Sequence, residues 1–136
     1  MDKNKFNKAS NDCKKVTEWL KVPIQFEFDT AIKPIFTDNL VHFNGVDEEG
    51  HETFLIQQTF EGYRQEIDGK LFQFCKTARK PYDTAVTACL IIFKHHFGND
   101  FVVKSDGYPS EWQNGLNAVK ECLGYGENPM QAGKLP

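Results

Sequence analysis

A cluster of cationic and hydroxyl side chains within residues 75–83 is the part of this sequence best suited to bind an anion. The segment reads Cys-Lys-Thr-Ala-Arg-Lys-Pro-Tyr-Asp, and it leaves a predicted strand to enter a predicted helix. Free backbone amides and a partial positive charge at the start of a helix attract phosphate or carboxylate groups. The side chains that would strengthen this attraction are Lys76, Thr77, Arg79 and Lys80. Alternatively, the segment is a solvated loop whose cations pair with Asp83 and nearby acids. It contains no G-x-x-x-x-G-K-[ST] motif, so it is not a nucleotide P-loop.

A second polar group, Ser105-Asp106-Gly107, follows the next predicted strand. If that strand runs parallel to the one before residues 75–83, the carboxyl ends of both strands open on the same edge of a sheet. Ligands of open α/β sheets commonly bind at that edge. We therefore expect Ser105 and Asp106 to complete one ligand-binding site with Lys76, Thr77, Arg79 and Lys80. The alternative is a simple turn, since each residue of Ser-Asp-Gly-Tyr-Pro favours turns.

The histidines and cysteines predict neither a catalytic site nor a metal site. His95 and His96 are adjacent, and adjacent residues on a helix point about 100° apart, so both cannot face one ion. Cys89 lies seven residues before His96, about 10 Å along a helix axis, which is too far for direct activation of the thiol. Cys75 could still meet a histidine from elsewhere. The sequence predicts no catalytic residue, no metal ligand and no cofactor.

The four cysteines are expected to be reduced. They include no C-x-x-C pair, and no secretory signal precedes them. Three of them fall in apolar patterns, where cysteine acts as a small hydrophobic residue.

The first part of the chain predicts one helix followed by strands. A helix from about 11 to 21 ends before Pro23, because a residue that precedes proline is pushed out of the helical region. Alternating polarity predicts strands over 24–29, 40–44, 53–58 and 70–76. Asp68-Gly69 predicts a two-residue hairpin in which residues 63–67 pair with the strand that follows, unless 63–67 belongs to a short helix.

The last third predicts a strand between two helices. Residues 81–97 read as a helix that is apolar nearly all round, which is typical of a helix buried between layers. A strand over 101–104 follows, and a capping box at Ser110–Gln113 opens a final helix that Gly124 closes. The strand–helix–strand unit from 70 to 104 would be a right-handed crossover with parallel strands. Trp19 and Trp112 are expected to anchor the core.

These elements predict a single α+β domain over residues 10–124. It would have a mainly antiparallel sheet, a C-terminal strand–helix–strand–helix unit and a buried central helix. Residues 1–9 are expected to be frayed, and residues 125–136 are expected to form a flexible tail. The length of 136 residues suits one domain.

Composition narrows the range of partners. The net charge is -3, and only Arg64 and Arg79 are arginines, which argues against nucleic-acid binding. The longest apolar run, from Ala88 to Phe93, is far too short to cross a bilayer. We therefore expect a cytoplasmic protein with no membrane partner. An edge strand near Pro34 could pair with a second copy, so a homodimer is left open.

The segment Phe74–Asp83, its apolar helix and Ser105-Asp106-Gly107 together resemble a pattern in small uncharacterised proteins of tailed bacteriophages. The resemblance covers residues 70–112 and implies a phage accessory protein in the cytoplasm of a host bacterium. It carries over no functional residue. The sequence thus predicts a binding protein that docks on a host protein or captures a small anionic ligand. The alternative is a small enzyme acting on a phosphorylated or carboxylated substrate.

Overall fold

The computed structural model describes residues 1–26, 32–46, 53–59, 66–67, 70–73, 81–103 and 112–126. Within these ranges the helices are α1 (Lys3–Leu20), α2 (Asp83–Phe97), the 3-10 turn η2 (Gly98–Asp100) and α3 (Gln113–Leu123). The strands are β1 (Ile24–Gln25), β2 (Ile35–Phe36), β3 (Leu40–Gly45), β4 (Phe54–Gln57), β5 (Glu66–Ile67), β6 (Lys70–Gln73) and β7 (Phe101–Val103). The predicted α+β domain is confirmed.

Helix α1 begins well before the residue near 11 at which the sequence predicted it. The Asp2 carboxylate caps the helix by accepting a hydrogen bond from the backbone N–H of Lys5 at 2.9 Å. Phe6 is fully buried and meets the ring of Phe93 in α2 edge-on, with centroids 5.2 Å apart. The expectation that residues 1–9 are frayed is therefore wrong, because a distant part of the chain holds the first turns of α1 in the core.

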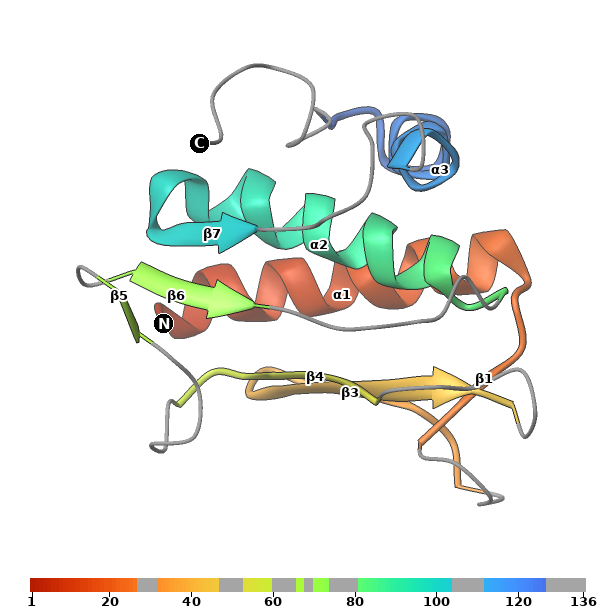
Figure 1. Cartoon of the computed structure of the whole chain (residues 1–136), viewed down its shortest axis with the longest axis horizontal. Helices are drawn as coiled ribbons and strands as arrows, with labels where there is room; N and C mark the ends of the chain where they lie inside the picture. The colour runs from red at the N-terminus through yellow and green to blue at the C-terminus, as the bar shows by residue number, and fades with distance from the viewer. Residues whose placement is uncertain are drawn as a thin grey trace.

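Strand β3 is the centre of an antiparallel sheet and pairs with β1, β2 and β4. Its Val41 and Phe43 stand opposite Ile56 and Phe54 of β4, and all four side chains are fully buried. The strands predicted over 40–44 and 53–58 are thus confirmed. Figure 1 shows this sheet on one side of α1, with α2 on the other side.

Strands β5, β6 and β7 form a second, smaller sheet. β5 pairs antiparallel with β6. Of the two alternatives for this segment, the hairpin is therefore confirmed and the short helix is not. The turn residues 68–69 lie outside the described part of the chain. β6 pairs parallel with β7, and Phe72 stands opposite Val102. The predicted parallel strand–helix–strand unit is confirmed, with α2 as its connecting helix.

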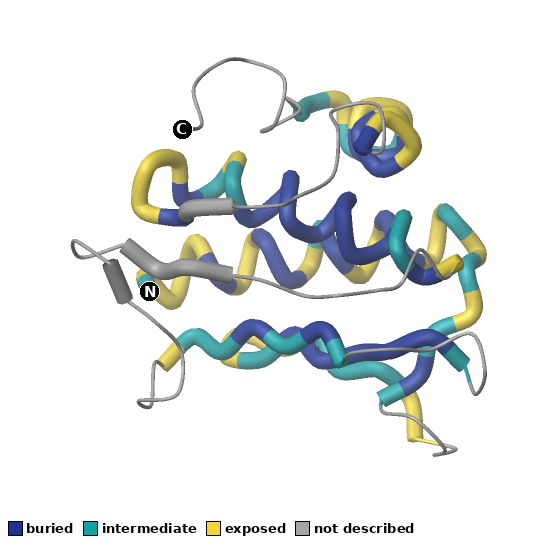
Figure 2. Tube along the Cα trace, in the orientation of Figure 1, coloured by how far each residue is buried: buried dark blue, intermediate teal, exposed yellow. Residues whose placement is uncertain are grey.

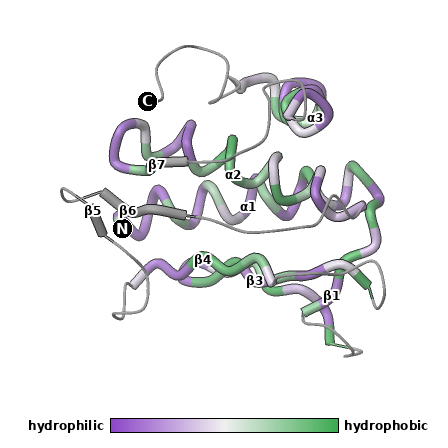
Figure 3. Tube along the Cα trace, viewed as in Figure 1, coloured by the Kyte–Doolittle hydropathy of each residue, from purple (hydrophilic) through white to green (hydrophobic). Residues whose placement is uncertain are grey.

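Helix α2 is buried along most of its length, as predicted. Figure 2 shows it between α1 and α3, and Figure 1 shows β7 beside it. Figure 3 shows hydrophobic residues along β3 and within α2, whereas α1 carries more hydrophilic residues. The buried residues of α2 are Ala85, Val86, Thr87, Ala88, Cys89, Leu90, Ile91, Ile92, Phe93 and Phe97. A helix with so little polar surface can be stable in water only if other elements cover it.

Two smaller expectations are wrong, and a third lies partly outside the described residues. Trp112 is buried at 3 % exposure, but Trp19 is 46 % exposed and does not anchor the core. The alternation predicted for the first strand placed Ile24 inward, yet Gln25 is the buried residue of β1. The residue that caps α3 is Trp112, without a side-chain bond, and Ser110 of the predicted capping box lies outside the described residues.

The predicted flexible tail does not begin at residue 125. Tyr125 is partly buried against the core. An added Cβ at Gly126, whose φ of +132° is open chiefly to glycine, would come within 3.2 Å of Val119. Residues 127–136 lie outside the described part of the chain.

Helices α2 and α3 approach each other closely at Gly115. A Cβ added there would lie 2.3 Å from Oγ1 of Thr87 and 2.9 Å from the backbone nitrogen of Ala88. We predict that Gly115→Ala lowers the free energy of unfolding by about 1–3 kcal/mol, because the helices must separate. The exposed neighbour Asn114→Ala is the matched control and should be nearly neutral. Urea unfolding measures both; a stabilised Gly115→Ala variant would contradict this packing.

Candidate functional site

The predicted anion site depends on two parallel strands that end at one edge. Leu71 of β6 stands opposite Phe101 of β7, and Gln73 opposite Val103, so the carboxyl ends of both strands do lie at the same edge. The predicted ligands themselves all lie outside the described residues: Lys76, Thr77, Arg79, Lys80, Ser105 and Asp106. The direction of the strands is confirmed, and the site at their ends remains a prediction.

A group of polar side chains that the sequence did not predict joins the three helices. Asp12 comes from α1, His96 from the last turn of α2, and Tyr125 from the segment after α3; we call these three residues the clasp. His96 Nε2 lies 2.9 Å from Oδ2 of Asp12, and the Tyr125 hydroxyl donates to the same oxygen at 2.6 Å. His95 stacks on the Tyr125 ring, with centroids 3.8 Å apart.

The electrostatics of the clasp favour a neutral tyrosine that donates to a carboxylate. Burial raises the pKa of Tyr125, and its hydrogen bond to Asp12 raises it further. The phenol therefore keeps its proton at neutral pH. An ionised carboxylate only accepts hydrogen bonds, so His96 Nε2 must carry a proton toward Asp12. Both bonds thus involve a charged group, and such bonds are stronger than neutral ones.

The clasp is built to hold helices together. Its polar atoms are directed at one another, and the side chains of His96 and Asp12 are only 16 % and 19 % exposed. The rings of His95 and His96 stand at 84°, as expected for adjacent helical residues. In the part of the chain that the structure describes, no group of three histidines, cysteines or acids could hold a metal ion.

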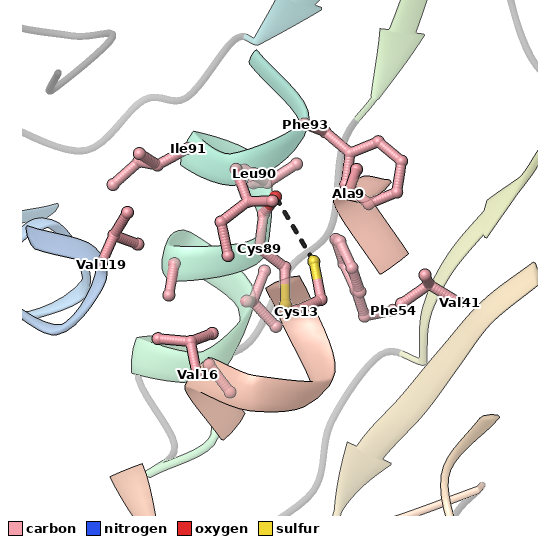
Figure 4. Close-up of a cluster of buried hydrophobic side chains, with 14 of the residues drawn as sticks. Ala9, Cys13, Val16, Val41, Phe54, Cys89, Leu90, Ile91, Phe93 and Val119 are labelled. Atoms are coloured by element: carbon pink, nitrogen blue, oxygen red, sulfur yellow. Dashed lines mark hydrogen bonds between the residues drawn. The ribbon is translucent and has the colours of Figure 1, made fainter. Parts of the chain in front are cut away.

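The thiols at the contact between α1 and α2 are also structural. Cys13 and Cys89 are both fully buried, and the Cys13 thiol points toward the carbonyl oxygen of Cys89 at 4.0 Å (Figure 4). Burial raises the pKa of Cys13 well above its ordinary value. A thiol that keeps its proton is a poor nucleophile, so this pair fills space as small hydrophobic residues.

A pocket of about 570 Å³ opens where the C-terminal half of α1 meets β1 and β2. This volume is within the range that holds a small organic ligand. The lining includes polar and apolar residues, and we call these two sets its polar wall and its apolar wall. Its polar lining consists of Lys14, Thr17, Glu18, Lys21 and Lys33. Its apolar lining consists of Val22, Pro23, Ile24, Pro34 and Phe36. At the right of Figure 1, the chain leaves α1 and descends to β1, and Val22, Pro23 and Ile24 of this connection belong to the lining.

The local backbone explains the shape of the pocket. Lys21 ends α1 in the left-handed conformation (φ 58°), and its N–H bonds the Thr17 carbonyl at 3.2 Å. The chain then reverses through Val22 and Pro23 into β1, which pairs with the far end of β3. α1 therefore stops above the sheet, and a hollow remains between its last turns and β2.

Among the residues that the structure describes, three cations of the pocket form no ion pair with an acid. Lys14, Lys21 and Lys33 line it together with one acid, Glu18. The ion pairs of the described residues are Lys3 with Asp38 and the His96–Asp12 pair of the clasp, and neither includes a pocket lysine. The pocket therefore carries unneutralised positive charge, which an anionic ligand could neutralise.

Sequence reasoning missed these lysines for a physical reason. Lys14 and Lys21 lie seven residues apart, so they share one face of a helix. The sequence shows this spacing, but the same spacing is equally typical of a helix face that is exposed to solvent. Lys33 lines the same pocket only because β1 and β2 fold back onto the end of α1. No local sequence pattern predicts that contact.

Comparison with protein-family models, with curated proteins and with solved structures finds no match for this chain. No helix in the described residues has the length and hydrophobicity needed to span a membrane. The function must therefore be argued from the geometry of the chain itself.

We predict that the clasp stabilises the fold through two coupled hydrogen bonds. Tyr125→Phe should lower the free energy of unfolding by about 1–2 kcal/mol, because the partly buried Asp12 loses one of its two donors and keeps only His96. Asp12→Asn should cost a similar amount, and the double variant should cost about 1 kcal/mol less than the sum. The exposed Asp100→Asn is the control. Strictly additive effects in urea unfolding would show that the two residues do not interact.

We also predict a pH dependence that comes from His95. Burial, and next the charge of His96, lower the pKa of His95 below its ordinary 6.5, while Asp12 partly opposes this. The unfolded chain therefore binds the proton more tightly, so the free energy of unfolding is highest above pH 6.5 and falls as the pH drops below it.

His95→Phe tests this because it keeps a ring on Tyr125 but removes the titration. Its free energy of unfolding should fall less than that of the wild type between about pH 7.5 and 5.5. The other ionisable groups of this region (Asp12, Lys15, His96, Cys122 and Tyr125) are unchanged in the variant. Equal slopes for the two proteins would refute the assignment.

Proposed function

We propose that this chain is a non-enzymatic binding protein that captures a small anionic ligand in the pocket between α1, β1 and β2. The observation that carries the proposal is a pocket of about 570 Å³ lined by three lysines that form no ion pair within the described part of the chain. A concave site with an apolar wall and a few convergent polar groups is typical of ligand binding.

The charge of the pocket supports an anion as its occupant. Three lysines and Glu18 leave two net positive charges at neutral pH. The pocket lies at the C-terminal end of α1, where the helix dipole contributes a partial charge of about −0.5. This opposes the lysines but is too small to cancel them. An anion therefore gains from entering, although salt will weaken the gain at this exposed site.

Capture of a small ligand has better support than docking on a host protein. The exposed large hydrophobic side chains among the described residues are Trp19 and Ile32. Trp19 lies on α1 and Ile32 lies just before β2. Protein-docking surfaces usually present a contiguous apolar patch of several hundred Å². Two large side chains on separate elements are weaker support than a formed pocket.

The cellular setting of this function has less support than ligand binding itself. The resemblance of residues 70–112 to bacteriophage proteins supports an accessory role in a bacterial cytoplasm, and it is the sole support for that role. The predicted edge at Lys76–Lys80 and Ser105–Asp106 is a second place where the same class of ligand could bind. The experiment must therefore distinguish the two places.

A thermal-shift screen with inorganic phosphate, acetate and phenyl phosphate tests the proposal. A ligand at 100 times its dissociation constant adds about 2.7 kcal/mol to stability, which raises Tm by several degrees. The triple variant Lys14→Ala, Lys21→Ala, Lys33→Ala should abolish the shift. The triple variant Lys5→Ala, Lys8→Ala, Lys15→Ala has the same net charge, changes exposed α1 lysines outside the pocket, and should keep the shift.

Two outcomes would contradict the proposal in different ways. If Arg79→Ala, Lys80→Ala abolishes the shift and the pocket triple variant keeps it, the ligand binds at the strand edge and the pocket assignment is wrong. If no anion raises Tm in the wild type, anion capture itself is wrong.

A further inference from the structure

The two walls of the pocket differ in chemistry, and the apolar wall is not needed to bind a bare anion. Among the described lining residues, five of ten are apolar and come from the α1–β1 connection, β1, Pro34 and β2. The polar wall includes Lys14 of α1, Lys21 at its C-cap, and Lys33 next to Pro34. A fully solvated ion such as phosphate would leave the apolar half filled with water. A ligand that matches both walls must have one charged end and one apolar end.

The apolar wall has features suited to a flat ring. Phe36 is half-buried, and its ring packs against that of Phe43 with centroids 5.9 Å apart, so it is held from behind by the core. Pro23 and Pro34 add two rigid rings to the lining. Aromatic bodies pack well against aromatic and other rigid apolar side chains, because little conformational entropy is lost there.

The polar wall has features suited to a phosphate rather than a planar carboxylate. Its cations are lysines, which act as point charges with no preferred fork geometry. Arginine, the usual bidentate partner of a planar carboxylate, is not among the described residues that line this pocket. Lys14 and Lys21 are two helical turns apart, about 10 Å along the axis, and their long side chains can converge on one head group from either side. Two net positive charges match a phosphate monoester that carries up to two negative charges.

We infer that the pocket takes an aryl phosphate monoester, with its phosphate among Lys14, Lys21 and Lys33 and its ring against Phe36 and the two prolines. This inference rests on the proposed capture of an anion and adds the chemical class of the ligand. The Thr17 hydroxyl donates to the Lys14 carbonyl at 3.0 Å, so its proton is already used within α1 and is not free for a phosphate. The lysines therefore provide the recognition of the head group.

Isothermal titration calorimetry with four probes tests the inference. The probes are 1-naphthyl phosphate, 1-naphthol, glycerol 3-phosphate and inorganic phosphate. 1-Naphthyl phosphate should bind at least ten times more tightly than each of the other three. Glycerol 3-phosphate has the same head group with a polar body, and 1-naphthol has the same ring without the charge. The comparison therefore separates the two walls.

Variants then assign each part of the ligand to its wall. Phe36→Ala should remove most of the preference for 1-naphthyl phosphate over glycerol 3-phosphate and leave the affinity for glycerol 3-phosphate within about two-fold. Because Phe36 also supports Phe43, the more exposed Pro23→Ser is a second variant that should reduce the preference without threatening the fold. The Lys14, Lys21, Lys33 triple variant should weaken every phosphate probe at least ten-fold.

The outcomes distinguish this inference from the proposed function. Equal affinity for all three phosphates would overturn the aryl phosphate assignment and leave anion capture intact. Equal affinity for 1-naphthol and 1-naphthyl phosphate would show an apolar site in which the lysines play no part. If none of the phosphates binds, both the inference and the proposed function fail.

Discussion

The fold depends on covering α2 on all sides. Its apolar side chains extend round nearly its whole circumference, and exposing them to water would cost about 25 cal/mol for each Å². α1 covers one side, α3 covers another, and β7 lies beside its C-terminal half (Figure 2). Small residues allow these close contacts: Gly115 lies against Thr87, and Cys13 against Cys89. The clasp then ties the C-terminal end of α2 to α1 and to the segment after α3.

This constraint also explains where a ligand pocket can form. α1 packs against α2, against α3 and beside the antiparallel sheet, and no other described element covers its remaining face. Lys14, Glu18 and Lys21 are exposed at the C-terminal end of α1. The chain then turns through Val22 and Pro23 into β1, and residues of α1, β1 and β2 together line the pocket. The pocket forms because α1 is packed between two layers and ends beside β1 and β2. Its positive charge comes from the lysines at this end of α1 and from Lys33.

Much of the fold was predictable because its signals are local. The buried helix from 81 to 97 is clear from composition, and the parallel pairing of β6 with β7 follows from the order strand–helix–strand. The start of α1 was not predictable, because Phe6 is held by Phe93. The clasp joins residues 84 and 113 positions apart in the sequence, and no spacing rule connects them. The exposure of Trp19 and the burial of Gln25 likewise depend on which elements pack beside them. The predicted ligands between 76 and 106 lie outside the described residues.

The central claim is that ligand capture takes place where α1 meets β1 and β2. The most direct test is to map backbone amide chemical shifts by NMR while 1-naphthyl phosphate is added to the wild-type protein. The account predicts that the largest changes lie at residues 14–24 and 33–36, with little change near His96 and Tyr125. Changes confined to residues 76–80 and 105–106, with none at the end of α1, would contradict it.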